Sequence, residues 1–183
     1  SPASQGKIIG EEISYNGGLT GEIIINGRTV EVKEEDDIDK ICEKLRNACN
    51  TLDISVYYSE DEEGNNKKLE FITNDFGSEA EIQLECDNED LFKALGFASR
   101  EVTARGDNLE VELTNFSETA TVTVTGNKIT ITDKNNFKMK LEAKPGIMHN
   151  VDGNQEEVIR ISILDAGPMK LQIGANQEQT MEI

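Results

Sequence analysis

Residues 21–32 read GEIIINGRTVEV, and this stretch carries the clearest structural signal in the sequence. Apolar residues recur at every second position on both sides of a central pair: Ile23, Ile25, Val30 and Val32. The central pair, Asn26-Gly27, supplies the two residues that tolerate the positive φ angles of a type I′ turn. Because that turn matches the twist of the strands it joins, the stretch predicts a β-hairpin with one buried face.

An amphipathic helix is predicted directly after the hairpin. Asp36 and Asp37 offer a carboxylate that can cap the first helical turn and that is favourable at the positive end of the helix dipole. The apolar residues that follow are spaced three and four apart and form one continuous stripe: Ile38, Ile41, Cys42, Leu45, Ala48 and Cys49. Since charged side chains occupy the other face, we expect this helix to pack on a sheet.

Further strands and a second, short helix are predicted before Phe97. Residues 54–59 and 68–73 read as the strands of a hairpin whose loop is the acidic stretch SEDEEGNN. Residues 80–84 alternate apolar and polar side chains and predict another strand. Asn88 is the expected cap of a short helix with Gly96 just past its end. The order β-β-α-β-β-β-α describes one compact α+β unit.

The remaining chain is threonine-rich and shows no further helical periodicity. Alternating apolar residues predict a set of strands between residues 109 and 141, with Gly126-Asn127 as one turn. After a polar connector at 144–156, residues 157–164 and 169–173 predict the last two strands. The expected fold class is α+β, predominantly β, with two small β-rich subdomains, the first having one amphipathic helix packed on a sheet. Residues 20–98 form the first subdomain, and residues 1–19 with 99–173 form the second.

The charge of the chain excludes some partners. It has 18 basic and 36 acidic residues, a formal net charge of -18. Such a surface repels phosphate, so neither nucleic acid nor an anionic membrane is an expected partner. No apolar run approaches the roughly 20 residues of a membrane-spanning helix. The N-terminus lacks the basic and apolar regions of a secretory signal, so we expect any export signal to lie elsewhere.

No catalytic, cofactor or metal site is expected. The single histidine, His149, lies in a loop rich in Asn and Gly and could join a Ser-His-Asp arrangement only if that loop met Asp152 and a serine in space. The acidic loop at 60–64 lacks the alternating ligands and the final glutamate of an EF-hand. The tripeptide Arg105-Gly106-Asp107 spells an integrin motif, but Gly-Asp is also ordinary turn chemistry.

The three cysteines are predicted to be buried apolar residues. Cys42, Cys49 and Cys86 are odd in number and include no Cys-x-x-Cys pair, which argues against a disulfide framework and against a structural metal. Cys42 and Cys49 share one helix face about 10 Å apart along the axis, which is too far for a disulfide.

The C-terminal stretch resembles bacterial flagellin. Residues 169–183, MKLQIGANQEQTMEI, are similar to the segment that leads from the exposed outer domains of that family back to the rod of the filament core. The family's LQIGAN box corresponds here to Leu171, Gln172, Ile173, Gly174, Ala175 and Asn176. Residues 177–179, Gln-Glu-Gln, stand where the family has Glu-Gly-Gln, so its turn glycine is missing. The resemblance implies that residues 174–183 join a long rod helix that this chain does not contain.

A second resemblance comes from independent residues. The hairpin 21–32, the acid-capped helix, KLEFIT at 68–73 and GSEAEIQL at 77–84 look like the repeat of flagellins and hook-associated proteins that is named for its Ile-Asn pair. Ile25-Asn26 provides that pair, and Arg46-Asn47 stands where the family has a second one. The strand-rich strings at 106–113, 123–134 and 136–142 resemble the part of flagellin outer domains that flanks the repeat.

These resemblances imply a structural protein with no cofactor and no enzyme activity. The expected function is that of the exposed, antigenic outer region of flagellin in the extracellular filament of the bacterial flagellum, serving motility. Its partners would be other flagellin subunits, contacted through rod domains absent from this fragment, so the fragment itself is expected to be monomeric. One alternative is a fragment of a hook-associated or filament-cap protein. Another is a secreted carbohydrate-binding or adhesin module, since β-rich domains with acidic loops also bind sugars and calcium.

Overall fold

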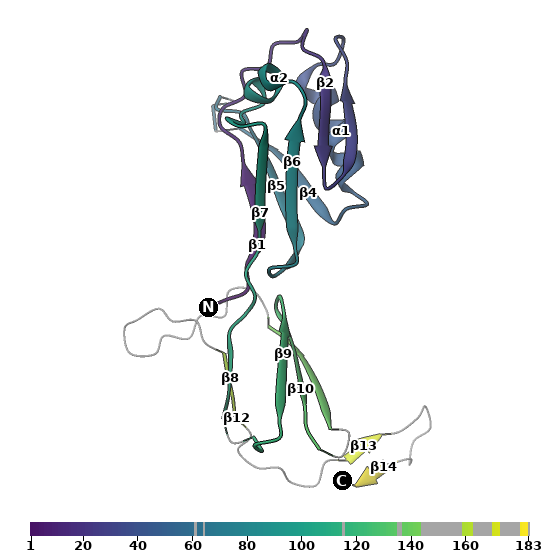
Figure 1. Ribbon diagram of the computed structural model, residues 1–183, viewed down its shortest axis with the longest axis vertical. Helices are drawn as coiled ribbons and strands as arrows, with labels where there is room; N and C mark the ends of the chain where they lie inside the picture. The colour runs from purple at the N-terminus through teal and green to yellow at the C-terminus, as the bar shows by residue number, and fades with distance from the viewer. Residues whose placement is uncertain are drawn as a thin grey trace, which may run out of the picture.

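The computed structural model describes residues 1–60, 62–63, 65–114, 116–134, 137–143, 159–162, 170–172 and 180–182. These residues form two lobes stacked end to end, the first at the top of Figure 1 and the second below it. Of the described residues, the first lobe comprises those in 5–105, and the second comprises those in 1–4, 106–143 and 159–162. Strands far outnumber helices in both, which confirms an α+β fold that is predominantly β.

The predicted hairpin is the start of a four-stranded sheet. β2 (Gly21–Ile25) pairs antiparallel with β3 (Arg28–Val32), and Ile25 lies opposite Arg28. Asn26 and Gly27 have φ angles of 47° and 80°, as the type I′ prediction requires. β6 (Glu81–Cys86) pairs with the other side of β2, and β7 (Glu101–Arg105) pairs with β6. The strand order is therefore β3-β2-β6-β7.

A second, three-stranded sheet of the first lobe includes the N-terminus. β1 (Gln5–Ile9) pairs with β5 (Lys68–Phe76), and β5 pairs with β4 (Ile54–Ser59), all antiparallel. β1 belongs to this sheet because it pairs with β5, which lies more than sixty positions later in the sequence. Its Ile8 is 4% exposed and belongs to the core of the first lobe.

These pairings correct the expected subdomain boundaries. The sequence pattern predicted that residues 1–19 and 99–173 form the second subdomain. Strand pairing instead places β1 and β7 in the first lobe. Only the first few residues stay with the second lobe, where Ala3 packs against its core. The local pattern could not show this because strand pairing joins residues that are distant in the sequence.

Both predicted helices form where expected. The carboxylate of Asp37 accepts a hydrogen bond from the Lys40 N–H at 2.7 Å and caps α1 (Ile38–Cys49). The side chain of Asn88 accepts from the N–H groups of Asp90 and Leu91 and caps α2 (Glu89–Ala94). α1 lies against β3 and β4, and α2 lies against β6. Each helix buries its apolar side in the core of the first lobe.

The second lobe has a much smaller core. β9 (Thr121–Thr125), β10 (Lys128–Thr132) and β11 (Lys138–Glu142) form an antiparallel meander, with the predicted turn at Gly126-Asn127 between the first two. β8 (Val111–Thr114) lies outside this meander and pairs in parallel with β12 (Ile159–Ser162). The described residues buried in this core are Leu109, Ile129 and Ile131.

The C-terminal strand prediction is confirmed in part. β13 (Lys170–Gln172) pairs antiparallel with β14 (Thr180–Glu182) in a two-stranded ribbon. Residues 180–182, within the stretch that the resemblance assigns to the junction with a rod helix, are extended. The predicted connector at 144–156 lies outside the described residues.

Two adjacent chain crossings join the lobes. Ser4 on the first crossing and Asp107 on the second bond to each other: the Ser4 N–H donates to the Asp107 carbonyl at 2.9 Å, and the Asp107 N–H donates to Ser4 Oγ at 2.9 Å. Asn108 Oδ1 accepts from the N–H groups of Ser78 at 3.1 Å and Gly126 at 2.9 Å, so one amide contacts both lobes. These bonds hold the tip of the β9–β10 turn against the end of β5.

Candidate functional site

An open hollow lies along the outer edge of β4, and we call it the β4 groove. It has a volume of about 380 Å³ and polar side chains dominate its lining. Its lining residues are Arg46, Asn47, Asn50, Ile54, Ser55, Val56, Tyr57 and Asn74. β4 is an edge strand of the three-stranded sheet, so its outer backbone groups are not used by a neighbouring strand.

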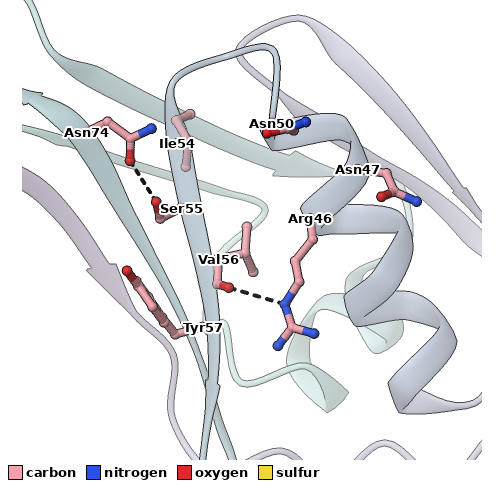
Figure 2. Close-up of a pocket in the computed structure, with 8 residues that line it drawn as sticks. All are labelled: Arg46, Asn47, Asn50, Ile54, Ser55, Val56, Tyr57 and Asn74. Carbon is pink, nitrogen blue, oxygen red and sulfur yellow. Dashed lines mark hydrogen bonds between the residues drawn. The ribbon is translucent and has the colours of Figure 1, made fainter.

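Figure 2 shows how α1 and β4 position these side chains. Arg46 lies on the last turn of α1 and donates a hydrogen bond from Nε to the carbonyl of Val56 at 3.3 Å. Its two Nη groups are directed away from that carbonyl. On the other side of β4, Ser55 Oγ donates to Asn74 Oδ1 at 2.6 Å. Tyr57 lies beside them and is 52% exposed.

The β4 groove presents positive charge on a strongly negative protein. Within the described residues Arg46 forms no ion pair, whereas Lys44, two residues earlier, is paired with Asp36. A guanidinium is a planar cation with several N–H donors, and the Nη groups of Arg46 are available to an anion. The groove therefore suits a polar ligand better than an apolar one.

The serine hydroxyl of this groove is paired with an amide. The hydroxyl of Ser55 donates to an amide oxygen rather than to a base, so nothing in the described groove activates it as a nucleophile. In the ranges that the structure describes, no cluster of three or more His, Cys, Asp or Glu residues could hold a metal ion.

The motif predicted from the flagellin resemblance is only partly described. Leu171 and Gln172 lie in β13, opposite Met181 and Thr180 of β14. Ile173, Gly174, Ala175 and Asn176 lie outside the described residues, as do His149 and Asp152. The role of the motif in joining a rod thus stays a prediction.

The integrin-type tripeptide lies where the chain passes from β7 into the second lobe. Arg105 Nη2 donates to Glu81 Oε2 at 3.0 Å, and the carboxylate of Asp107 accepts from Ser4 Oγ at 3.0 Å. Gly106 is buried, and a β-carbon there would collide with the backbone of Ser4. Gly106 and Asp107 thus lie against Ser4 at the junction, whereas Arg105 pairs with Glu81 across β6 and β7 of the first lobe. In the acidic loop, Glu60, Glu62 and Glu63 are exposed.

The cysteine prediction is confirmed, because all three thiols are free and buried. Burial raises the pKa of Cys42 and of Cys49 to about 11. Burial also raises the pKa of Cys86, although a hydrogen bond with the backbone of Asn88 partly lowers it. A thiol with a raised pKa carries little of the reactive thiolate near neutral pH.

Sequence reasoning did not find the β4 groove. Its residues come from the end of a helix, an edge strand and the following strand, and they match no spacing motif. Arg46, Asn47 and Asn50 read simply as the polar face of α1. A signal was present in the half-exposed Tyr57, which is a large aromatic residue at a position where the alternation predicts solvent exposure.

Comparison with known proteins adds no assignment. No protein-family model matches the chain, and neither the curated proteins nor the solved structures include a match. Of the two helices in the described part of the chain, neither has the length and apolar character needed to cross a bilayer.

Proposed function

We propose that this chain is the exposed outer region of a flagellin, displayed on the extracellular filament of the bacterial flagellum. In this role it is structural and non-catalytic and serves motility. The proposal comes from the two sequence resemblances, at residues 17–97 and 169–183. The path of the chain through the two lobes supports it.

The observation that carries most weight is the position of the first lobe within the chain. Ser1 lies in the second lobe, where its carbonyl accepts from the Glu110 N–H at 3.0 Å. The chain then enters the first lobe at Gln5 and returns at Arg105, and β12 again belongs to the second lobe. The first lobe is therefore an insertion reached through two adjacent crossings (Figure 1). Such an arrangement suits a body that is attached through the second lobe and carries the first lobe farther out.

One edge of each sheet in the first lobe, β3 and β4, carries a cation from α1. Lys44 Nζ donates to the carbonyl of Glu31 on edge strand β3 at 3.1 Å, and Arg46 Nε donates to Val56 on edge strand β4. Lysine and arginine on an open edge oppose pairing with a second chain. The net charge of -18 adds repulsion between copies. Both features suit subunits that must stand close together without aggregating.

A monomer is the expected state of the isolated chain, because assembly would use rod helices outside it. Light scattering at micromolar concentration should give a mass near 20.2 kDa. A stable dimer or larger species under the same conditions would contradict the proposal that rod helices outside this chain carry assembly.

Immunogold electron microscopy tests the function against its alternatives. Antibodies raised against this chain should label filaments along their whole length on cells of the organism that encodes it. Labelling confined to the hook junction or the filament tip would overturn the proposal in favour of a hook-associated or cap protein. Labelling of the cell surface with bare filaments would favour a secreted adhesin.

A further inference from the structure

We propose that the β4 groove binds a sugar that carries a carboxylate, such as a uronic or sialic acid. This inference goes beyond filament structure, because it gives the displayed surface a ligand. It depends on the contacts of Arg46, Val56, Tyr57 and the neighbouring amides, and it does not require the flagellin proposal to be correct.

Two sets of donors in the groove suit a carboxylate. Arg46 Nε is held on the carbonyl of Val56, which fixes the plane of the guanidinium, and no hydrogen bond to its Nη groups forms among the described residues. A planar guanidinium whose two Nη groups are free pairs with a carboxylate through two parallel N–H···O hydrogen bonds. In an antiparallel strand the N–H and C=O of one residue point to the same side. Since the carbonyl of Val56 faces Arg46, its N–H also faces the groove.

The remaining lining suits a ring with hydroxyl groups. Asn47, Asn50 and Asn74 supply amides that both donate and accept, and they lie on both sides of β4. Tyr57 offers an aromatic face with a polar tip. The volume of about 380 Å³ lies within the range of roughly 300–1,000 Å³ that is usual for small-molecule sites. The backbone of β4, a strand of a packed sheet, provides a preformed wall.

The charge of the whole protein favours a single negative charge on the ligand. A net charge of -18 repels a doubly charged phosphate more than a singly charged carboxylate. One unpaired arginine balances one carboxylate. A neutral sugar would leave the guanidinium without a partner of opposite charge.

Two-dimensional ¹H–¹⁵N NMR of the full chain tests the proposal. Glucuronic acid and N-acetylneuraminic acid should each be titrated separately, with galactose and inorganic phosphate as comparison ligands. We expect saturable shifts at the Arg46 Nε–H, the Val56 N–H and the side-chain amides of Asn47, Asn50 and Asn74 with at least one acid sugar. The acid whose shifts saturate at the lower concentration shows whether the groove prefers a uronic acid or a sialic acid. No saturable shift with either acid, or equal binding of galactose or of phosphate, would overturn the proposal.

Two substitutions separate the groove from general charge effects. Arg46→Gln should weaken binding by about tenfold or more, since hydrogen bonds between charged groups contribute about 1.5–3 kcal/mol and each 1.4 kcal/mol is a factor of ten. Arg28→Gln removes the same charge from exposed β3 and should leave binding unchanged. Tyr57→Ala, at an exposed position, should weaken binding severalfold without loss of the native spectrum. Unchanged affinity in both Arg46→Gln and Tyr57→Ala would refute the site. Neither result bears on immunogold labelling of filaments, so failure of this inference and failure of the proposed function can be told apart.

Discussion

Replacing Gly126 with alanine should unfold the second lobe and leave the first lobe folded. Gly126 has a φ angle of 60° at the tip of the β9–β10 turn, where it packs against the end of β5 in the first lobe. A β-carbon there would lie far inside van der Waals distance of the Phe76 carbonyl oxygen and 2.8 Å from its carbon. The substitution thus adds both backbone strain and a collision with a neighbouring backbone.

The loss of folding free energy is the sum of the backbone strain and the steric collision. A non-glycine residue at positive φ costs about 1–2 kcal/mol. Forcing an extra carbon into a packed site costs about 1–3 kcal/mol more. The sum, about 2–5 kcal/mol, is large for a lobe whose buried apolar core among the described residues consists of Leu109, Ile129 and Ile131. The first lobe has a far larger core and does not depend on this turn.

Gly27 provides a matched control for this substitution. Its φ angle is 80°, and a β-carbon there would meet nothing within 4 Å. Gly27→Ala should therefore show only the strain of about 1–2 kcal/mol. ¹H–¹⁵N NMR during urea titration follows both lobes separately. The reasoning would be refuted if Gly126→Ala cost no more than Gly27→Ala, or if both lobes unfolded together at one urea concentration in the Gly126 variant.

Further predictions concern the first lobe. Asp37→Ala removes the cap of α1 and should lower the free energy of unfolding by about 1 kcal/mol in urea titration, with an unchanged value contradicting the capping role. Hydrogen bonds from the Lys33 N–H and the Lys44 ammonium hold the pKa of Asp36 below its ordinary 3.8. The ionised carboxylate therefore stabilises the fold above about pH 3.8, and this stabilisation is lost as the pH falls through the lowered pKa. Asp36→Asn should be less stable than the native protein at about pH 7 and should lose less stability between about pH 5 and pH 2; a parallel decline would contradict this. A thiol reagent at about pH 8 should label Cys42, Cys49 and Cys86 only after denaturation, and rapid labelling of the native chain would contradict their burial.

Much of the first lobe could be predicted because its signals are local. The Asn26-Gly27 turn, the stripe on α1 and the caps Asp37 and Asn88 each depend on residues a few positions apart. Asp36, offered as a second candidate cap, instead binds the Lys33 N–H and the Lys44 ammonium. The sequence alone could not choose between two adjacent carboxylates because both sit at the start of the helix.

The features that the sequence did not reveal depend on distant contacts. β1 is a strand of the first lobe only because β5 lies beside it, and the parallel pairing of β8 with β12 likewise joins separated segments. The β4 groove combines Arg46 from a helix with Tyr57 and Asn74 from two strands. No spacing rule within one element could have brought these side chains together.

Cryo-electron microscopy of flagellar filaments from the organism that encodes this chain offers the decisive test. If the chain is the outer region of flagellin, both lobes should fit the density that projects from the filament core, with the second lobe nearer the axis and the first lobe outermost. Density that cannot hold the two lobes, or a first lobe packed against the core, would contradict the assignment.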